Sequence, residues 1–483
     1  MAKAPTILLV TCFAMAGCTV GPDYVRPAAP LAPSFIHAAA IDTRHADANW
    51  WRSFDDPLVV ALVDRAIANN TDLAQARARI EQSRDAARSA GAALLPALGA
   101  TGAATTLSQS RDTAIGRITQ AIGAPRGSTE YAIGTQASWE VDLFGGVRRG
   151  REAARDDLAA TEVDAGALAV SVAAETADAY LTLRAFQARL AVASDQARNE
   201  ALLASLVRQR FDHGVAAERE VNRTVAQLEG VRAAMAPLRA GIEAQLNRLD
   251  VLVGDPPGSN RAQLIEARPV PVAPLPEGSA DPVELLRRRP DVVAAERRLA
   301  ASNARVGVAI ADYYPHLSLS GLLGVASLGT GNLFSGGAVE ASGGAGLRWR
   351  LFDFGRIDAE VAGARGREAE ALAAWRGSVL AAAEDVETAL ARLKEAHVER
   401  AGLEREVAAL DRARGQAREA YTGGVVGLIE VIDAERETLS VSDRLAFVRA
   451  AEARAAISAY RALGGGWQAP GAPALASTAG KLR

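Results

Sequence analysis

The amino-acid sequence predicts a mainly α-helical fold with transmembrane β-strands, organised as an internal two-fold repeat. Three observations carry this prediction: a duplicated residue pattern, very long helical stretches, and short stretches in which polar and apolar residues alternate. The composition agrees, because 49% of the residues are hydrophobic while only 5% are aromatic. A chain rich in alanine and poor in aromatic side chains suits long, closely packed helices better than a bulky globular core.

The duplication is visible in residues that recur at nearly constant spacing. One set recurs 210 positions later: Trp139 and Trp349, Phe144 and Phe354, Gly145 and Gly355, Phe211 and Tyr421, Gly214 and Gly424. An upstream set recurs 219 positions later: Asp72 and Asp291, Arg79 and Arg298, Pro96 and Pro315. A unit of this length exceeds the roughly 20 to 50 residues of a solenoid repeat. We therefore expect two copies of one large element in a pseudo-symmetric body.

The first residues indicate a cleaved and lipidated N-terminus. Lys3 precedes a short apolar run, Thr6 to Met15, which is too short to span a bilayer as a helix. Small residues then lead to Cys18, an order that resembles a bacterial lipoprotein signal, in which the cysteine is released and acylated. We expect a signal peptide over residues 1–17 and lipidation at Cys18. The alternative is an ordinary signal peptide with an incidental cysteine.

The first copy is predicted to occupy residues 55–253, after a proline-rich tether over 18–54. Helical sequence begins near Pro57 and runs to about Ala93, where Pro96 ends it. A weak strand follows over about 96–107, and the polar residues 108–129 predict a loop. Residues 130–144 alternate between an apolar and a polar face, which is the pattern of a strand in a transmembrane barrel.

Long helical hairpins are predicted after each pair of strands. Arg148 to about Phe211 contains no proline and would extend about 95 Å as one helix. A glycine break follows, and a second helix returns to about Leu252. In the last helix of the chain, Ala434, Val441 and Val448 are spaced by seven residues, which predicts coiled-coil packing.

The second copy is predicted over residues 282–464, after an equatorial linker at 254–281 and before a C-terminal tail at 465–483. Its strands are expected at about 315–327 and 343–354, and its long helices at about 356–421 and 427–463. Four strands are too few to close a barrel, since single-chain barrels have at least about eight. An open sheet edge cannot face lipid, so several chains would have to pool their strands.

Other function classes are not supported by the sequence. The net charge of −3 provides no basic face for nucleic acid. The five histidines are scattered, and no pair stands at metal-ligand spacing. The Gly-rich runs at 329–331 and 343–346 lack the Lys-Ser/Thr of a phosphate loop, and no nucleophile-elbow motif is present. We expect no enzyme activity, no cofactor and no metal site.

Five short motifs identify a family resemblance that covers nearly the whole chain. They are Gly17–Tyr24 with Arg26-Pro27, Trp51 with Phe54–Leu58, Arg289-Pro290-Asp291, Tyr314-Pro315, and Asp433-Ala434-Glu435-Arg436. Together they resemble the TolC-like outer-membrane efflux proteins (outer membrane factors). The nearest branch is the NodT-type lipoproteins, which carry palmitate and act with resistance-nodulation-division (RND) pumps.

The resemblance implies a homotrimer in which twelve strands, four per chain, form one outer-membrane β-barrel. Twelve helices would continue it as an α-helical barrel through the periplasm, surrounded by an equatorial domain. The implied function is passive export of small molecules, loaded by a periplasmic adaptor and an inner-membrane RND-type pump, with outer-membrane lipid around the barrel. The alternative is a lipid-anchored periplasmic coiled-coil scaffold without a pore.

The resemblance also implies two sites. Contact with the adaptor is expected at the helical turns, at Gly214, Val215, Gly423 and Gly424, although a glycine that ends a helix needs no further role. A periplasmic gate is expected from inward rings of Ile429, Asp433 and Arg436. A simple intrahelical pair between Asp433 and Arg436 is the alternative. Glu435 stands where relatives often have glutamine.

Overall fold

The computed structural model describes residues 19–32, 34–36, 49–272 and 288–467, which fall into two compact units. The strand unit comprises Met1–Pro27, Glu81–Ala160 and Glu296–Ala374, and the helical unit comprises Ala28–Ile80, Thr161–Ala295 and Trp375–Arg483. Cys18 and the predicted signal peptide lie outside the described residues, as do parts of the predicted tether, linker and tail.

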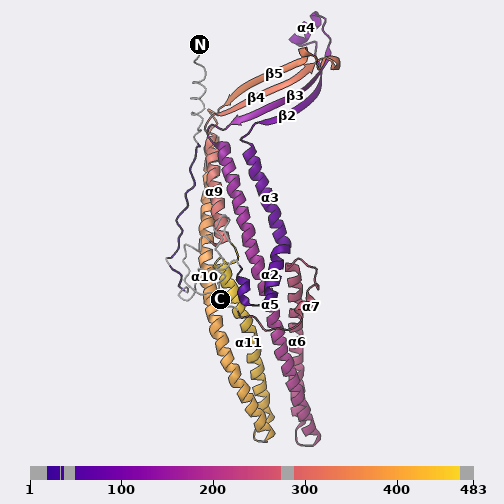
Figure 1. Ribbon diagram of the computed structural model, residues 1–483, viewed down its shortest axis with the longest axis vertical. Coiled ribbons are helices and arrows are strands. Elements are labelled where there is room, and N and C mark those ends of the chain that lie inside the picture. Colours follow the sequence, from indigo (N-terminus) through magenta and orange to yellow (C-terminus); the bar gives the residue numbers. More distant parts are fainter. Residues whose placement is uncertain (1–18, 33, 37–48, 273–287, 468–483) are drawn as a thin grey trace, which may run out of the picture. The chain divides into compact units, whose positions relative to one another are not determined.

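The strand unit contains one four-stranded antiparallel sheet in the order β2-β3-β4-β5 (Figure 1). The strands are β2 (Ala97–Ser108), β3 (Gly127–Val141), β4 (His316–Ser327) and β5 (Val339–Arg348). Because β2 and β5 stand at the ends of this order, each forms a sheet edge. The two strands of the first predicted copy thus lie beside the two strands of the second.

The register gives the sheet one apolar face. Residues opposite each other in an antiparallel pair point to the same face. Ile133 lies opposite Val325, and Val325 lies opposite Val339. The intervening positions, which point to the other face, are mostly small or polar: Gln136, Ser138, Glu140, Ser318, Ser320 and Ser342. The apolar face is not covered by the rest of the chain, since Ile133 and Leu323 are exposed.

Two strands end earlier than the sequence predicts, because the turn into the next helix takes residues from them. β5 ends at Arg348 rather than near residue 354. The Asp353 carboxylate accepts hydrogen bonds from the backbone N–H groups of Gly355 and Ile357, and Phe354 adopts a left-handed φ of 55°. β3 likewise ends at Val141, before the Asp142 carboxylate accepts from the first turn of the following helix.

A short helix, α4 (Ala114–Ala121), corrects the prediction of a loop over residues 108–129. Thr113 begins it, because its hydroxyl accepts a hydrogen bond from the Gly116 N–H at 3.1 Å. Isoleucines at positions 115, 118 and 122 have helical spacing, which was a signal for this helix. Figure 1 shows α4 at the end of the sheet that also carries the loop between β4 and β5.

Two long hairpins follow the strand pairs. The first consists of α5 (Gly146–Asp212) and α6 (Glu218–Leu252), and the second of α10 (Arg356–Thr422) and α11 (Leu428–Ala462). α5 and α10 each contain 67 residues, and α6 and α11 each contain 35. A helix of 67 residues extends about 100 Å. The shorter elements are η3 (Trp50–Phe54), α2 (Pro57–Asn69), α3 (Thr71–Ala92), α7 (Arg261–Leu264), α9 (Pro290–Ala311), η4 (Thr330–Asn332) and η5 (Gly336–Ala338).

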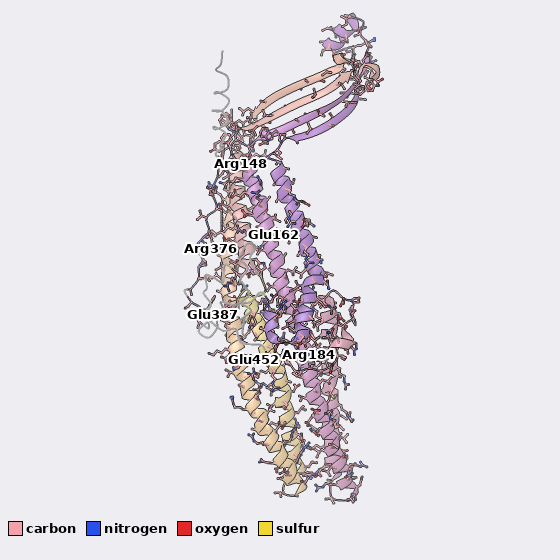
Figure 2. All side chains as sticks on the ribbon, in the orientation of Figure 1. Arg148, Glu162, Arg184, Arg376, Glu387 and Glu452 are labelled. Carbon is pink, nitrogen blue, oxygen red and sulfur yellow. The ribbon has the colours of Figure 1, made fainter. Side chains whose placement is uncertain are left out.

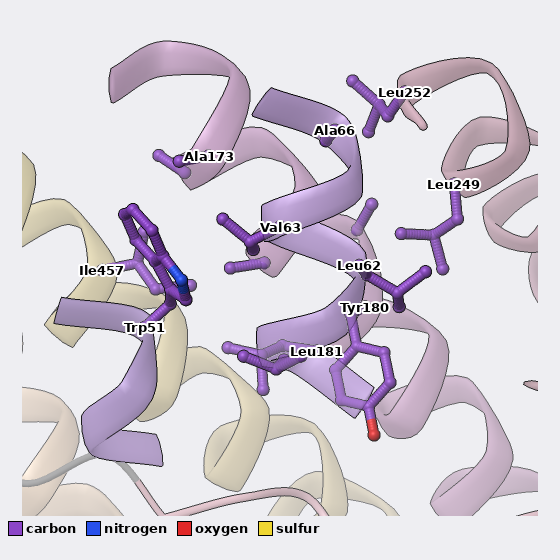
Figure 3. Close-up of a cluster of buried hydrophobic side chains, with 14 of the residues drawn as sticks. Trp51, Leu62, Val63, Ala66, Ala173, Tyr180, Leu181, Leu249, Leu252 and Ile457 are labelled. Atoms are coloured by element: carbon purple, nitrogen blue, oxygen red, sulfur yellow. The ribbon is translucent and has the colours of Figure 1, made fainter. Parts of the chain in front are cut away.

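The main hydrophobic core lies in the helical unit, where η3 and α2 pack against the hairpin helices (Figure 3). It includes Trp51, Val63, Leu181, Leu249 and Ile457. The hydroxyl of the buried Tyr180 donates to the carboxylate of Asp56, which caps the start of α2. Burial, together with this hydrogen bond, raises the pKa of Tyr180 to about 12. The short helices before the first strand are thus fixed to α5.

The segment that follows Cys18 is bound to the strand unit. The buried guanidinium of Arg149 donates to the Val20 carbonyl at 3.2 Å and to the Asp23 carboxylate at 2.6 Å. The Val20 N–H donates to the Phe144 carbonyl at 3.1 Å. Figure 2 labels the neighbouring Arg148, at the start of α5. These contacts hold the segment at the junction of β3 and α5.

Among the described residues, no helix combines the length and the apolar character needed to cross a membrane.

Candidate functional site at the helical turns

The turns that join the paired helices contain the four residues predicted to contact an adaptor. Gly214 and Gly424 adopt left-handed φ values of 73° and 76° and end α5 and α10. In the first turn the Val215 N–H donates to the Arg210 carbonyl at 2.8 Å, and in the second the Val425 N–H donates to the Ala420 carbonyl at 2.9 Å. Both are Schellman closures, which satisfy the last carbonyls of a helix and reverse the chain.

Replacing Gly424 by alanine is expected to destabilise the turn by about 1–2 kcal/mol, because an L side chain is disfavoured at this φ. No atom lies within 4 Å of the added Cβ, so the cost is conformational rather than steric. Hydrogen exchange of the turn amides should become faster. Gly423→Ala is the matched control, since Gly423 has no left-handed φ and its nearest atom is 3.4 Å from the added Cβ. Equal exchange in the two variants would contradict the prediction.

A small hydrophobic cluster joins the ends of the two hairpins. Its buried residues are Val207, Val221, Tyr421, Leu428, Val431 and Ile432, which come from all four long helices. The Arg210 guanidinium lies 4.9 Å from the centre of the Tyr421 ring and covers one side of the cluster. Val215 and Val425 remain exposed at the turns. The turns therefore present apolar side chains on a packed, well-supported base.

The three predicted gate residues share one exposed face of α11. Ile429 is 42% exposed, and Asp433 and Arg436 are exposed as well. Their spacing of four and three residues places them in one row along the helix. Among the ion pairs of the described residues, none joins Asp433 to Arg436. The opposite face of α11 is buried through Val431, Ile432 and Glu435.

Glu435 is the charged residue of this region that sequence reasoning did not place. Its side chain is 1% exposed and forms an ion pair with Arg418 of α10, while Arg414 lies 3.9 Å away. Glu435 is four residues after Val431 and three before Thr438, which are themselves seven residues apart. That spacing was the available signal that Glu435 faces the interior.

A second buried carboxylate, Glu200 of α5, lies close enough to Glu435 for their charges to interact. One of its oxygens accepts a hydrogen bond from the Gln196 amide at 2.8 Å, while the other finds no donor among the described residues. Burial raises the pKa of Glu200, with a further contribution from the negative charge of Glu435, against opposing effects of Gln196 and Arg418. The guanidinium of Arg418 therefore pairs with Glu435 of the second hairpin and also acts through its charge on Glu200 of the first.

The raised pKa of Glu200 gives an expected pH dependence. Folded protein holds this proton more tightly than unfolded protein, so stability should increase as the pH falls from the folded pKa toward the ordinary glutamate value of about 4.3. Glu200→Gln should remove that increment and stabilise the protein by about 1–2 kcal/mol at neutral pH. Thermal unfolding of the detergent-solubilised protein, followed by helical circular dichroism across this pH range, measures both. A wild-type minus variant difference that does not change with pH would contradict the assignment.

Further ion pairs join the first hairpin to α11. The Arg189 guanidinium of α5 binds both carboxylate oxygens of Asp443 at 2.7 and 2.9 Å. The Arg454 guanidinium of α11 binds both oxygens of Asp178, at 2.5 and 3.2 Å. Such two-point contacts fix direction as well as distance. In the described parts of the chain, no group of three or more His, Cys, Asp or Glu side chains is arranged to hold a metal ion.

Comparisons with known proteins agree on one family. The family model described as outer membrane efflux protein matches residues 62–255 and 282–465. The chain is 32% identical to outer membrane protein OprJ of Pseudomonas aeruginosa, over 95% of each chain. It is 28% identical to cation efflux system protein CusC of Escherichia coli O6:H1, over 96% of this chain and all of the relative. The solved structure of the outer-membrane channel OprN matches with a TM-score of 0.85 and 34% identity, covering 93% of this chain and 99% of OprN.

Proposed function

The chain belongs to the outer membrane efflux protein family, and from this premise we propose that three copies form the outer-membrane exit channel of a tripartite efflux system. The channel is a passive duct for small molecules, which a periplasmic adaptor and an inner-membrane RND-type pump deliver to it. Selection among substrates lies mostly with the pump, because a wide water-filled tube makes few discriminating contacts.

The two-faced sheet with two edges supports an oligomer of strand-pooling copies, and the family resemblance gives their number as three. An antiparallel sheet with one apolar and one polar face suits a wall between lipid and water. Its edges at β2 and β5 have to be paired within a membrane, because no water is there to hydrogen-bond them. Three copies joined edge to edge supply twelve strands, which form one closed β-barrel.

The helices extend this arrangement into the periplasm as an α-helical barrel. The equal lengths of α5 and α10, and of α6 and α11, support two quasi-equivalent hairpins per chain. The family model also matches in two stretches that fall on the two predicted copies. Three chains supply six hairpins around one tube, with the short helices and linker residues as an equatorial domain.

The helical turns and the exposed residues of α11 correspond to the two sites that the resemblance implies, the adaptor contact and the periplasmic gate. Gly214, Val215, Gly423 and Gly424 form the adaptor-contact surface, supported by the exposed valines on their packed base. Ile429, Asp433 and Arg436 close the periplasmic end, supported by their exposure along one helix face. Lipidation at Cys18 anchors the chain in the membrane, supported by the short apolar run and the small residues that precede this cysteine.

Two measurements separate this channel from a lipid-anchored scaffold without a pore. Purified protein added to a planar lipid bilayer should produce discrete conductance steps. The unboiled protein should also migrate anomalously on a denaturing gel and shift on heating, as closed membrane barrels do. Absence of conductance together with heat-independent migration would favour the scaffold and overturn the proposal.

A further inference from the structure

The loop between β2 and β3 contains an exposed apolar surface that the channel function does not use. We call it the loop surface, and it consists of the isoleucines of α4 and its end: Ile115, Ile118 and Ile122. They are 63%, 62% and 72% exposed. At 100° per residue their side chains fall within about 60° around the helix axis. A row of large apolar side chains this exposed on one side of a helix marks an interaction surface.

The local structure fixes the direction of this surface. Gly116 is the buried residue of α4, and a Cβ added there would lie 1.8 Å from the Ser110 carbonyl oxygen. The helix therefore packs on its own loop through Gly116. The isoleucines point well away from that contact, and Gln120 lies on the side opposite to them. Because the chain packs on α4 through Gly116 and not through the isoleucines, these side chains remain available to an external occupant.

Charge indicates the kind of occupant. The loop over residues 109–126 contains three arginines, Arg111, Arg117 and Arg126, and one acidic residue, Asp112. All three arginines are exposed. An amphipathic helix with apolar residues on one side and basic residues around it is typical of segments that lie in the interface of an anionic lipid layer. Guanidinium groups bind phosphate with two hydrogen bonds, which suits phosphate-bearing headgroups.

The surface also continues a face already assigned to lipid. β2 ends and β3 begins at the same end of the sheet where β4 ends and β5 begins. At that end the apolar face finishes with Val339 at the start of β5, and the neighbouring loop exposes Leu328 and Phe334. The β2–β3 loop and the β4–β5 loop, at the same end of the sheet, thus both expose large apolar side chains.

We propose that α4 lies in the outer membrane–water interface, with Ile115, Ile118 and Ile122 inserted into lipid and the loop arginines on headgroup phosphates. This inference rests on the proposed function, because it requires the sheet to span the membrane. It adds a lateral contact with lipid at the outer end of the barrel, where the loop surface would act as an anchor that fixes the height of the barrel in the bilayer.

The test uses full-length protein with a spin label at position 118 or 120, introduced as Ile118→Cys or Gln120→Cys. The unsubstituted chain, labelled in parallel, measures the background from any native cysteine that remains reactive. Vesicles contain phosphatidylcholine alone or mixed with phosphatidylglycerol. Relaxation by oxygen reports contact with lipid, and relaxation by a nickel chelate reports contact with water. The label at 118 should lie about 5–10 Å below the headgroup boundary, while the label at 120 should be in water.

Anionic lipid should increase the insertion depth of the label at position 118. Replacing Arg111, Arg117 and Arg126 together by glutamine should abolish this dependence of depth on anionic lipid. Equal exposure of both labels to the nickel chelate would overturn the proposal. Shielding of the label at 118 from both reagents would overturn it as well, since the surface would then be covered by protein. Conductance measured with the same vesicles distinguishes these results from failure of the channel itself, because a conducting channel with an aqueous α4 refutes only this inference.

Discussion

Replacing Asp433 and Arg436 together by alanine is expected to raise the single-channel conductance severalfold in a planar bilayer. In the proposed trimer each residue becomes a ring of three around the axis, and rings of charge at a constriction govern ion passage. The two side chains are exposed and are not paired with each other among the described ion pairs, so they are available to such a ring. Alanine removes both the bulk and the charge.

Arg223→Ala is the matched control, because Arg223 occupies on α6 the position that Asp433 occupies on α11, 210 residues later. It is exposed as well, and we expect it to leave the conductance unchanged. A double variant that conducts like the wild type would remove Asp433 and Arg436 from the gate. An equal increase in Arg223→Ala would assign the closure to both hairpins rather than to α11.

Replacing Arg418 by alanine is expected to have the largest effect on stability in the hairpins. It removes the nearer cationic partner of the Glu435 carboxylate, which is 1% exposed, and leaves only the Arg414 guanidinium at 3.9 Å. Removing one partner of a fully buried pair typically costs about 3–5 kcal/mol. Arg418 itself is 44% exposed, so water can reach the site, and we expect about 2–3 kcal/mol. The loss should appear as a lower thermal midpoint and faster amide exchange near Glu435.

A double-mutant cycle tests whether the cost comes from the unpaired charge. Glu435→Gln combined with Arg418→Ala should recover most of the lost stability, because an amide is easier to bury than a carboxylate. Arg436→Ala, one residue away on the exposed face of α11, should change the stability little. If the double variant is no more stable than Arg418→Ala alone, the loss arises from packing of the arginine stem rather than from Glu435.

Several parts of the fold could be read from the sequence because they rest on local periodicity. The absence of proline from Gly146 to Asp212, followed by a glycine that must adopt a positive φ, is enough to predict a long helix and its reversal. The alternation through Ile133, Thr135 and Ala137 predicts a strand with two different faces. Both patterns can be recognised within one segment of sequence, without knowing which other segments pack against it. The structure contains the long helices and the small sheet.

Other features were not predicted, either because they depend on contacts between distant residues or because their local signals are weak. The burial of Glu435 was not predicted, because a charged residue in a helix is usually solvated and this burial requires Arg418 of another helix. The early end of β5 depends on how Asp353 caps α10. The helix α4 was missed because the loop looked polar overall, while its three isoleucines are too few to dominate a composition-based assignment.

The two unpaired edges of the sheet make the chain prone to aggregation before it is assembled in the membrane. β2 and β5 each present a row of backbone donors and acceptors to any other strand, and the apolar face beside them is uncovered. A newly secreted chain would therefore be prone to aggregate until matching copies arrive. Assembly would depend on protein concentration, and chains that do not find matching copies should become insoluble even when the helical hairpins fold correctly.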